Sequence, residues 1–219
     1  MVVSESSARR YALDPDVRLM LEVRDDHAAA FEELVLRYQD RVVMVLEHLV
    51  NSRDQAEDLS QEVFLRVYRA RKSYLPTAKF ATWLFTIVNN VASNALRDQS
   101  RRHEVTLPTR DSNSTGFRPL DALLQASSGQ MPARQLDKAE TRDMVRMALQ
   151  TLGERQRMAV LLSKVEGMSY AEIAAALELS PQAVKSLLSR ARVNLRELLE
   201  PYLEGGNRPG AAPNRAKNE

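Results

Sequence analysis

The sequence predicts an all-α protein in which a flexible linker joins two small helical domains. Three observations lead to this prediction. Apolar residues recur at helical spacing in two stretches, residues 14–103 and residues 137–203. The stretch between them, residues 104–136, loses that period and contains several prolines. The composition agrees, because aromatic residues make up only 5% of the 219 residues and glycines number seven, which favours helices over a β-sandwich or barrel.

The N-terminal domain is expected to be a bundle of four helices. Asp14 followed by Pro15 fits a helix start, because aspartate caps free backbone N–H groups and proline suits the first helical position. Ser52 with Gln55 fits a capping box that opens the third helix. Trp83 falls on the apolar stripe of the fourth helix, so we expect it in the core. The four helices are expected near residues 14–24, 26–50, 52–70 and 80–103, with a loop at residues 73–79 that contains Pro76.

The remaining segments are expected to lie outside the two domains. Residues 1–13 form an N-terminal extension in this prediction. The linker, residues 104–136, has room for no more than a helical turn at residues 120–124. Residues 204–219 are rich in Gly, Pro, Asn and charge, which predicts a disordered tail.

The C-terminal domain, residues 137–203, contains the pattern of a helix-turn-helix. Ser169 and Glu172 form a capping box before a short helix, and Ser180 with Pro181 starts a longer one after a brief break. The longer helix has a polar and basic outer face, as expected for a helix that enters the major groove. A purely structural helical hairpin would have the same spacing. The candidate contacts to duplex DNA are Gln182, Lys185, Ser186, Ser189, Arg190 and Arg192.

The charges are distributed unevenly along the chain. Acidic residues outnumber basic ones between residues 14 and 62, and basic residues outnumber acidic ones between residues 63 and 110, although the net formal charge is only +2. This asymmetry suggests two kinds of partner, one of them a polyanion. An ordinary solvated helix surface would produce the same pattern, so charge alone does not decide.

Four segments of the second domain resemble region 4 of bacterial sigma factors of the extracytoplasmic-function (ECF) type. Gly153 stands where the family usually has proline, and Gln182-Ala183-Val184 replaces the usual Gly-Thr-Val where promoter choice is made. Response regulators end in similar domains, so these segments alone do not identify the family. The matching segments are residues 152–157, 167–174, 184–186 and 189–192.

The segment from Ala56 to Phe64 resembles region 2.2 of the same family, the helix that docks on the clamp coiled coil of the polymerase. Asp58, Gln61 and Glu62 share one helix face, because they lie at positions i, i+3 and i+4. The resemblance implies that these three residues bind core RNA polymerase. An ordinary solvated helix face remains the alternative for this segment taken by itself.

Residues 80–84 with Ile87 and Asn90 resemble regions 2.3 and 2.4, which bind the −10 element. A polar and basic stripe continues along this helix, and the family uses the preceding loop to hold a base flipped from the non-template strand. Tyr74 in that loop could stack on such a base or line the pocket that holds it. Relatives often have aspartate at the position of Asn94. The candidate −10 contacts are Tyr74, Lys79, Asn90, Asn94, Arg97 and Arg101.

Together the two resemblances imply a sigma factor that binds core RNA polymerase, recognises the −10 and −35 promoter elements and promotes DNA melting. The linker is too short for the additional domain of housekeeping sigma factors, which favours the ECF group. Many ECF relatives are bound by an anti-sigma factor that wedges between the domains, and a flexible linker would permit this.

Enzymatic activity is not expected. His27, His48 and His103 have no metal-ligand spacing, no phosphate-binding loop is present, and no cofactor or metal is implied. The chain has no cysteine, which excludes disulfides and thiolate metal sites. Without a signal peptide or membrane span, we expect a cytoplasmic protein. The rival functions are a DNA-binding regulator that does not join polymerase and a structural or adaptor protein.

Overall fold

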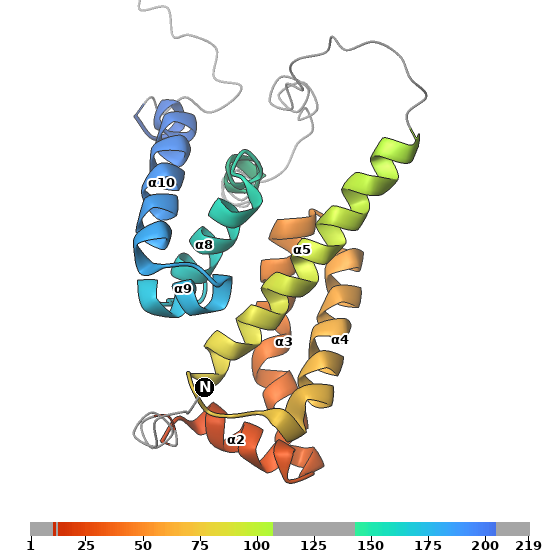
Figure 1. The fold of residues 1–219 in the computed structure, drawn as a ribbon. Helices are drawn as coiled ribbons and strands as arrows, with labels where there is room; N and C mark the ends of the chain where they lie inside the picture. The colour runs from red at the N-terminus through yellow and green to blue at the C-terminus, as the bar shows by residue number, and fades with distance from the viewer. Residues whose placement is uncertain (1–10, 12, 107–142, 205–219) are drawn as a thin grey trace, which may run out of the picture.

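The computed structural model describes residues 11, 13–106 and 143–204, and all regular secondary structure within these ranges is helical (Figure 1). The helical turn expected at residues 120–124 lies outside the described residues, as do most of the expected N-terminal extension, linker and tail. Residues 143–150 form a helical segment ahead of α8. The other elements are α2 (Pro15–Arg24), α3 (Ala28–Val50), α4 (Arg53–Ala70), the 3-10 turn η1 (Arg71–Ser73), α5 (Phe80–Thr106), α8 (Glu154–Lys164), α9 (Tyr170–Leu177) and α10 (Pro181–Glu204).

The expected helix starts are confirmed by their capping hydrogen bonds. The Asp14 side chain accepts from the backbone N–H of Asp16 at 2.9 Å, ahead of Pro15. The Ser52 hydroxyl caps α4, and the Ser169–Glu172 capping box at α9 is complete in both directions. These caps satisfy N–H groups that the first turn of a helix leaves without partners. The local sequence therefore sets where most of these helices begin.

The first four helices form the N-terminal bundle. The long helix α3 packs against α2, α4 and α5, and its inner face is lined by buried apolar side chains such as Leu34, Val42 and Leu46. Tyr38 donates its hydroxyl to the Asp16 carboxylate at 2.6 Å, which ties α3 to α2. At its far end α5 continues to Thr106, beyond the expected end at residue 103.

The C-terminal helices form the expected helix-turn-helix. Helix α10 packs on both α8 and α9 and buries Val184, Leu188 and Ala191 against them. Gly167 has a φ of +65° in the turn between α8 and α9, a conformation that glycine adopts without steric cost. No helix in the described part of the chain has both the length and the apolar character that a membrane span requires.

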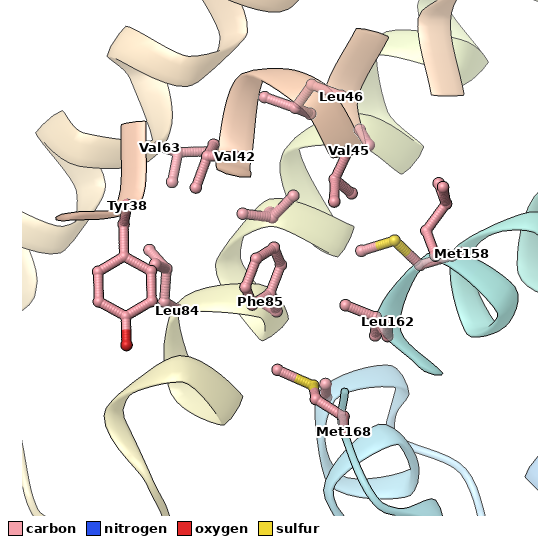
Figure 2. Packing of buried hydrophobic residues seen from close by; sticks show 14 of the residues in the cluster. Tyr38, Val42, Val45, Leu46, Val63, Leu84, Phe85, Met158, Leu162 and Met168 are labelled. Atoms are coloured by element: carbon pink, nitrogen blue, oxygen red, sulfur yellow. The ribbon is translucent and has the colours of Figure 1, made fainter. Parts of the chain in front are cut away.

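The two helical units share one continuous apolar core, which the sequence did not predict. Helix α9 packs against α5, and α8 packs against α3. Figure 2 shows Met158, Leu162 and Met168 of the second unit pointing toward Phe85 of α5 and Val45 of α3. All five side chains are buried. We call these five residues the interdomain seam.

Candidate nucleic-acid interface

The outer face of α10 presents every residue that the sequence predicts for duplex DNA. Proline at the first helical position and the Ser180 hydroxyl, which accepts from the N–H of Ala183 at 3.1 Å, fix the start of this helix. The guanidinium of Arg190 donates to the Ser186 hydroxyl at 3.0 Å, so these two side chains lie together. All six candidates, Gln182, Lys185, Ser186, Ser189, Arg190 and Arg192, are exposed.

Tyr170 is a further residue of this face that the sequence reasoning missed. It is the first residue of α9, and its hydroxyl accepts a hydrogen bond from Arg192 at 3.0 Å. Its side chain is exposed, whereas that of Met168, two residues earlier, is buried. An aromatic residue at the start of the first helix of the motif, outside its apolar face, was the available signal.

Helix α5 presents the second set of candidates as one exposed stripe. Asn90, Asn94, Arg97 and Arg101 are all exposed, while Val88, Val91 and Ala92 of the same helix are buried. Arg97 donates to the Asn94 side-chain oxygen at 2.7 Å and to the carbonyl of Ser93 at 3.2 Å. Two amide and two guanidinium side chains can therefore meet base edges and phosphates along one line.

Tyr74 differs from the other candidates because its side chain is buried. It is only 3% exposed, and its ring packs edge-on against Trp83 with the ring centroids 4.9 Å apart. Burial raises the pKa of the Tyr74 hydroxyl, which has no hydrogen-bond partner among the described residues. In this arrangement the ring cannot stack on a flipped base. Trp83 also contacts the buried Phe80, so the rings of Tyr74, Trp83 and Phe80 pack together at this loop.

Lys79, the last candidate of this set, extends from the same loop into solvent but already has a partner. Its ammonium lies 2.8 Å from the Glu172 carboxylate at the start of α9. Although burial favours the neutral acid, hydrogen bonds from Lys79 and Ser169 hold the pKa of Glu172 below its usual value. A predicted −10 contact is thus paired with the other helical unit.

Helix α4 presents the third set. Asp58 and Gln61 are exposed, and Glu62 is half-buried because Arg66 donates to its carboxylate at 2.7 Å. This hydrogen bond lowers the pKa of Glu62. All three residues lie on one side of the helix, as the spacing predicts.

An apolar groove of about 800 Å³ adjoins this face between α3 and α4. Leu65 and Tyr68 on its wall are 49% and 42% exposed, so large apolar side chains face solvent beside the acidic set. Gln61 belongs both to the groove and to the predicted core-binding set. The other apolar residues that line it are Phe31, Val35, Val43 and Phe64.

A metal site finds no support in the described ranges, where no group of three or more His, Asp or Glu side chains is placed to hold an ion. The exposed sets instead combine hydrogen-bonding amides and hydroxyls with guanidinium and ammonium groups on α5 and α10. Such sets bind nucleic acid non-covalently.

Comparison with known families agrees with this geometry. Residues 34–102 match the family model "Sigma-70 region 2", and residues 142–195 match "Sigma-70, region 4". RNA polymerase sigma factor CarQ of Myxococcus xanthus is 39% identical over 82% of this chain and 95% of its own length. The ECF RNA polymerase sigma-E factor of Escherichia coli is 33% identical over 86% of this chain and 96% of its own length.

Solved structures give the same relationship. CnrH, in a complex with the cytosolic domain of CnrY, matches with a TM-score of 0.61 and 25% identity over 84% of this chain and 97% of that one. The sigma factor RpoE of Bartonella quintana, in a complex with the anti-sigma factor NepR, matches with a TM-score of 0.58 and 25% identity over 78% of this chain and 96% of that one. The chain described here therefore belongs to the ECF group of the RNA polymerase sigma-70 family, the proteins that act with RNA polymerase in transcription initiation.

Proposed function

We propose that this sigma factor binds core RNA polymerase through α4, reads the −10 element with α5 and reads the −35 element with α10. The observation that carries the proposal is the exposure of two polar and basic DNA-binding faces on two separate helical units, beside a third acidic and apolar face on α4. A regulator that only binds duplex DNA would need the α10 face alone.

The proposed core-binding surface combines charge with apolar area. Asp58, Gln61 and Glu62 supply acceptors for a basic partner helix, and the groove between α3 and α4 offers apolar side chains for its apolar face. A helix with an apolar face flanked by arginines fits both parts. We propose the clamp coiled coil of the polymerase as this partner, as the resemblance of residues 56–64 to region 2.2 implies.

The proposed −10 contacts are Asn90, Asn94, Arg97 and Arg101 with Lys79 at the edge of the loop. Melting leaves a base unstacked at a cost of a few kcal/mol, so the protein must provide compensating contacts. With Tyr74 buried, the loop has to rearrange before that ring can contact a base. We therefore assign Tyr74 first to the support of the loop, and direct stacking remains the alternative that a substitution can test.

The proposed −35 contacts are the six exposed residues of α10, with Tyr170 added. Lysine and arginine supply phosphate affinity, while the Gln182 amide and the two serine hydroxyls can meet base edges. Because residues 182–184 depart from the usual family sequence, we expect this chain to select a −35 sequence that differs from those of its relatives.

We extend the proposal to an inhibitory protein partner of the anti-sigma type. Of the matched structures, RpoE is in a complex with the anti-sigma factor NepR, and CnrH is in a complex with the cytosolic domain of CnrY. The proposed partnership with polymerase also locates the protein in the cytoplasm, where this polymerase works.

Run-off transcription with purified core polymerase tests the proposal directly. We expect the full chain to form a holoenzyme and to open a promoter selected from a random −10/−35 library, with permanganate reactivity at unpaired thymines. A chain that binds duplex DNA but neither joins core polymerase nor opens any selected promoter would be a regulator instead.

A further inference from the structure

We propose that Tyr170 is a positioning residue for −35 recognition, which acts by holding the Arg192 guanidinium toward one phosphate strand of the duplex. Tyr170 belongs to α9 and Arg192 to α10, so the pair joins the two helices of the helix-turn-helix at its exposed face. The inference deepens the function proposed above and rests on it, because it assumes that α10 enters the major groove.

The capping box of α9 fixes the position of Tyr170. The Ser169 hydroxyl accepts from the N–H of Glu172 at 3.3 Å, and the Glu172 carboxylate accepts from the N–H of Ser169 at 2.8 Å. Tyr170 follows Ser169 directly, so this box sets its backbone conformation. Ile173 and Ala174 are buried and anchor the same turn in the core. The Tyr170 side chain therefore extends from a rigid helix start rather than from a loop.

Helical geometry places Arg190 and Arg192 on opposite edges of the α10 face. Successive residues are rotated by about 100° around a helix, so residues two positions apart point about 160° away from each other. Gln182 and Ser189 lie between these two directions, near the middle of the face. The face therefore has amide and hydroxyl groups at its centre and a guanidinium at each edge.

The major groove of DNA has a matching arrangement. Base edges form its floor, and a phosphate strand runs along each of its two sides. In a helix-turn-helix the second helix lies in the groove, while the first helix crosses the backbone. Arg192 lies at the edge of α10 that contacts the start of α9. It should therefore face the phosphate strand that the first helix crosses, with Gln182 and Ser189 toward the base edges.

A hydrogen bond from Arg192 to Tyr170 restrains the guanidinium at that edge. Arg192 Nη2 donates to the Tyr170 hydroxyl at 3.0 Å, across the junction between α9 and α10. Both side chains are exposed, so the bond lies at the surface where DNA is expected to bind. A guanidinium has five N–H donors, and one bond to tyrosine leaves others for a phosphate. The pair can therefore keep its geometry while Arg192 binds DNA.

An arginine that is held before binding has less freedom to lose when it meets a phosphate. Ordering a long side chain costs free energy, and a bond that already restrains it removes part of that cost. A tyrosine hydroxyl also orients the guanidinium without neutralising its charge, unlike the carboxylates that pair with Arg37, Arg41 and Arg53. The Tyr170 hydroxyl can therefore raise affinity without contacting DNA itself.

The other edge of the face provides a useful contrast. Arg190 donates to the Ser186 hydroxyl at 3.0 Å, but these two residues lie one turn apart in the same helix. The pair of Tyr170 and Arg192 spans 22 positions and forms only when α9 and α10 have packed together. Tyr170 therefore ties the direction of Arg192 to the crossing of the two helices.

A double-mutant cycle on duplex DNA tests the inference. The probe is a −35 duplex selected from a random library for binding to the full chain. Tyr170→Phe removes the hydroxyl and keeps the ring, so it should weaken binding about three- to tenfold. Arg192→Ala should weaken binding and lower the salt slope by about one unit. In the Arg192→Ala background, Tyr170→Phe should have no further effect.

Other roles for Tyr170 predict a different cycle. If its hydroxyl contacted DNA directly, or only stabilised α9, its loss would weaken binding equally with and without Arg192. Equal losses in the two backgrounds, or no loss in Tyr170→Phe alone, would overturn the inference. Thermal unfolding of Tyr170→Phe should match that of the parent chain, because the side chain is exposed.

Two control variants make the same chemical changes away from this face. Tyr68→Phe on α4 removes the hydroxyl of a tyrosine of similar exposure, 42% against 38% for Tyr170. Arg155→Ala removes an exposed arginine of α8. Neither variant should change the affinity for the duplex or the salt slope. Losses in these controls as large as those in the Tyr170 and Arg192 variants would also overturn the inference.

The two proposals fail in different ways. If the cycle shows coupling but the chain neither joins core polymerase nor opens a promoter, the proposed function is wrong and the role of Tyr170 stands. If holoenzyme forms and opens promoters while the cycle shows no coupling, the proposed function stands and this inference is wrong.

Discussion

Tyr74 shows how burial limits what a single side chain can do. The sequence places it in the loop where the family holds a flipped base, yet the ring packs against Trp83 and leaves its hydroxyl without a partner among the described residues. The exposed polar side chains of α5 and α10 have no such restriction. Single substitutions can therefore separate supporting residues from contacting ones.

Substitution of Tyr74 distinguishes support from stacking. Tyr74→Phe removes only the unpartnered hydroxyl, so the free energy of unfolding should stay the same or rise. Tyr74→Ala removes a buried ring and should cost about 3–5 kcal/mol of that free energy. Tyr74→Leu keeps apolar volume without an aromatic face, and it should bind single-stranded −10 DNA as the parent does. A loss of about 1–3 kcal/mol in that binding would instead show that the ring stacks on a base.

Lys185 and Arg190 should contribute to −35 binding in measurably different ways. A lost phosphate contact lowers the salt slope of DNA binding by about one unit, whereas a lost base contact costs roughly 1–3 kcal/mol and relaxes preference at one position. Lys185→Ala and Arg190→Ala, titrated across salt and promoter variants, separate the two cases. Glu178→Ala, in the turn before α10, is the control. The face would be misassigned if neither variant changed affinity, slope or preference.

Helix α4 carries the proposed core-binding surface, which several of its residues form together. Its acidic side chains face solvent beside the groove shared with α3, while its other side holds the bundle together. Surface charge reversals on a helix cost little stability, because exposed ion pairs contribute only about 0–1 kcal/mol. Partner binding can therefore be changed without unfolding the chain.

Reversal of charge at Asp58 and Glu62 should weaken binding to core polymerase. Asp58→Lys with Glu62→Lys places cations where the partner is expected to be basic, so the dissociation constant should rise at least about tenfold. Titration with labelled core enzyme measures it, and circular dichroism checks the fold. Glu32→Lys on the exposed face of α3 is the matched control. Unchanged affinity in the double variant would remove α4 from the interface.

His48, near the end of α3, should make the free energy of unfolding depend on pH. Burial, followed by the charge of Arg146, lowers the pKa of His48 below its usual 6.5, although Glu47 opposes this. The unfolded chain therefore takes up the proton first as pH falls. Stability should be constant well above pH 6.5 and decline as pH falls through it toward the folded-state value. Urea unfolding at pH 7.5 and 5.5 measures the loss, which His48→Gln should reduce. An equal loss in both proteins would assign it to other groups.

The whole molecule shows which features local sequence can predict. Helix starts at Asp14, Ser169 and Ser180 were predictable, because capping depends on residues two or three positions apart. The stripes on α4, α5 and α10 were predictable from helical periodicity for the same reason. These local rules account for both helical units and for the exposure of most candidate residues.

The contact between the units was not predictable, because it depends on residues far apart in the sequence. Met158 and Leu162 look like ordinary residues of an apolar helix face, and Glu166 belongs to a loop without periodicity. Their burial arises only when α8 and α9 meet α3 and α5. The burial of Tyr74 was not predicted either, because it depends on how the loop folds against Trp83 of α5.

Unfolding of the complete chain should be cooperative. The apolar core continues through both units, and the Arg157 guanidinium donates hydrogen bonds to carbonyls of both. Both features couple the stabilities of the two units. We expect one calorimetric transition with equal calorimetric and van't Hoff enthalpies. Arg157→Ala removes the bridge and should separate the transition into two, whereas Arg155→Ala, on the exposed side of α8, should not. Two transitions in the parent chain would show that the units unfold independently.

The sulfur atoms of the interdomain seam give this arrangement a chemical consequence. Met158 and Met168 are buried where the units meet, Met20 is buried within the first unit, and Met44 is 45% exposed. Oxidation to the sulfoxide requires access of peroxide to the thioether and converts an apolar side chain into a polar one. Of these four methionines, Met44 should therefore be oxidised first and Met20 last, with Met158 and Met168 oxidised at the rate at which the two units separate. Once oxidised, those two residues would no longer pack in the seam, so oxidative damage would hold the chain open.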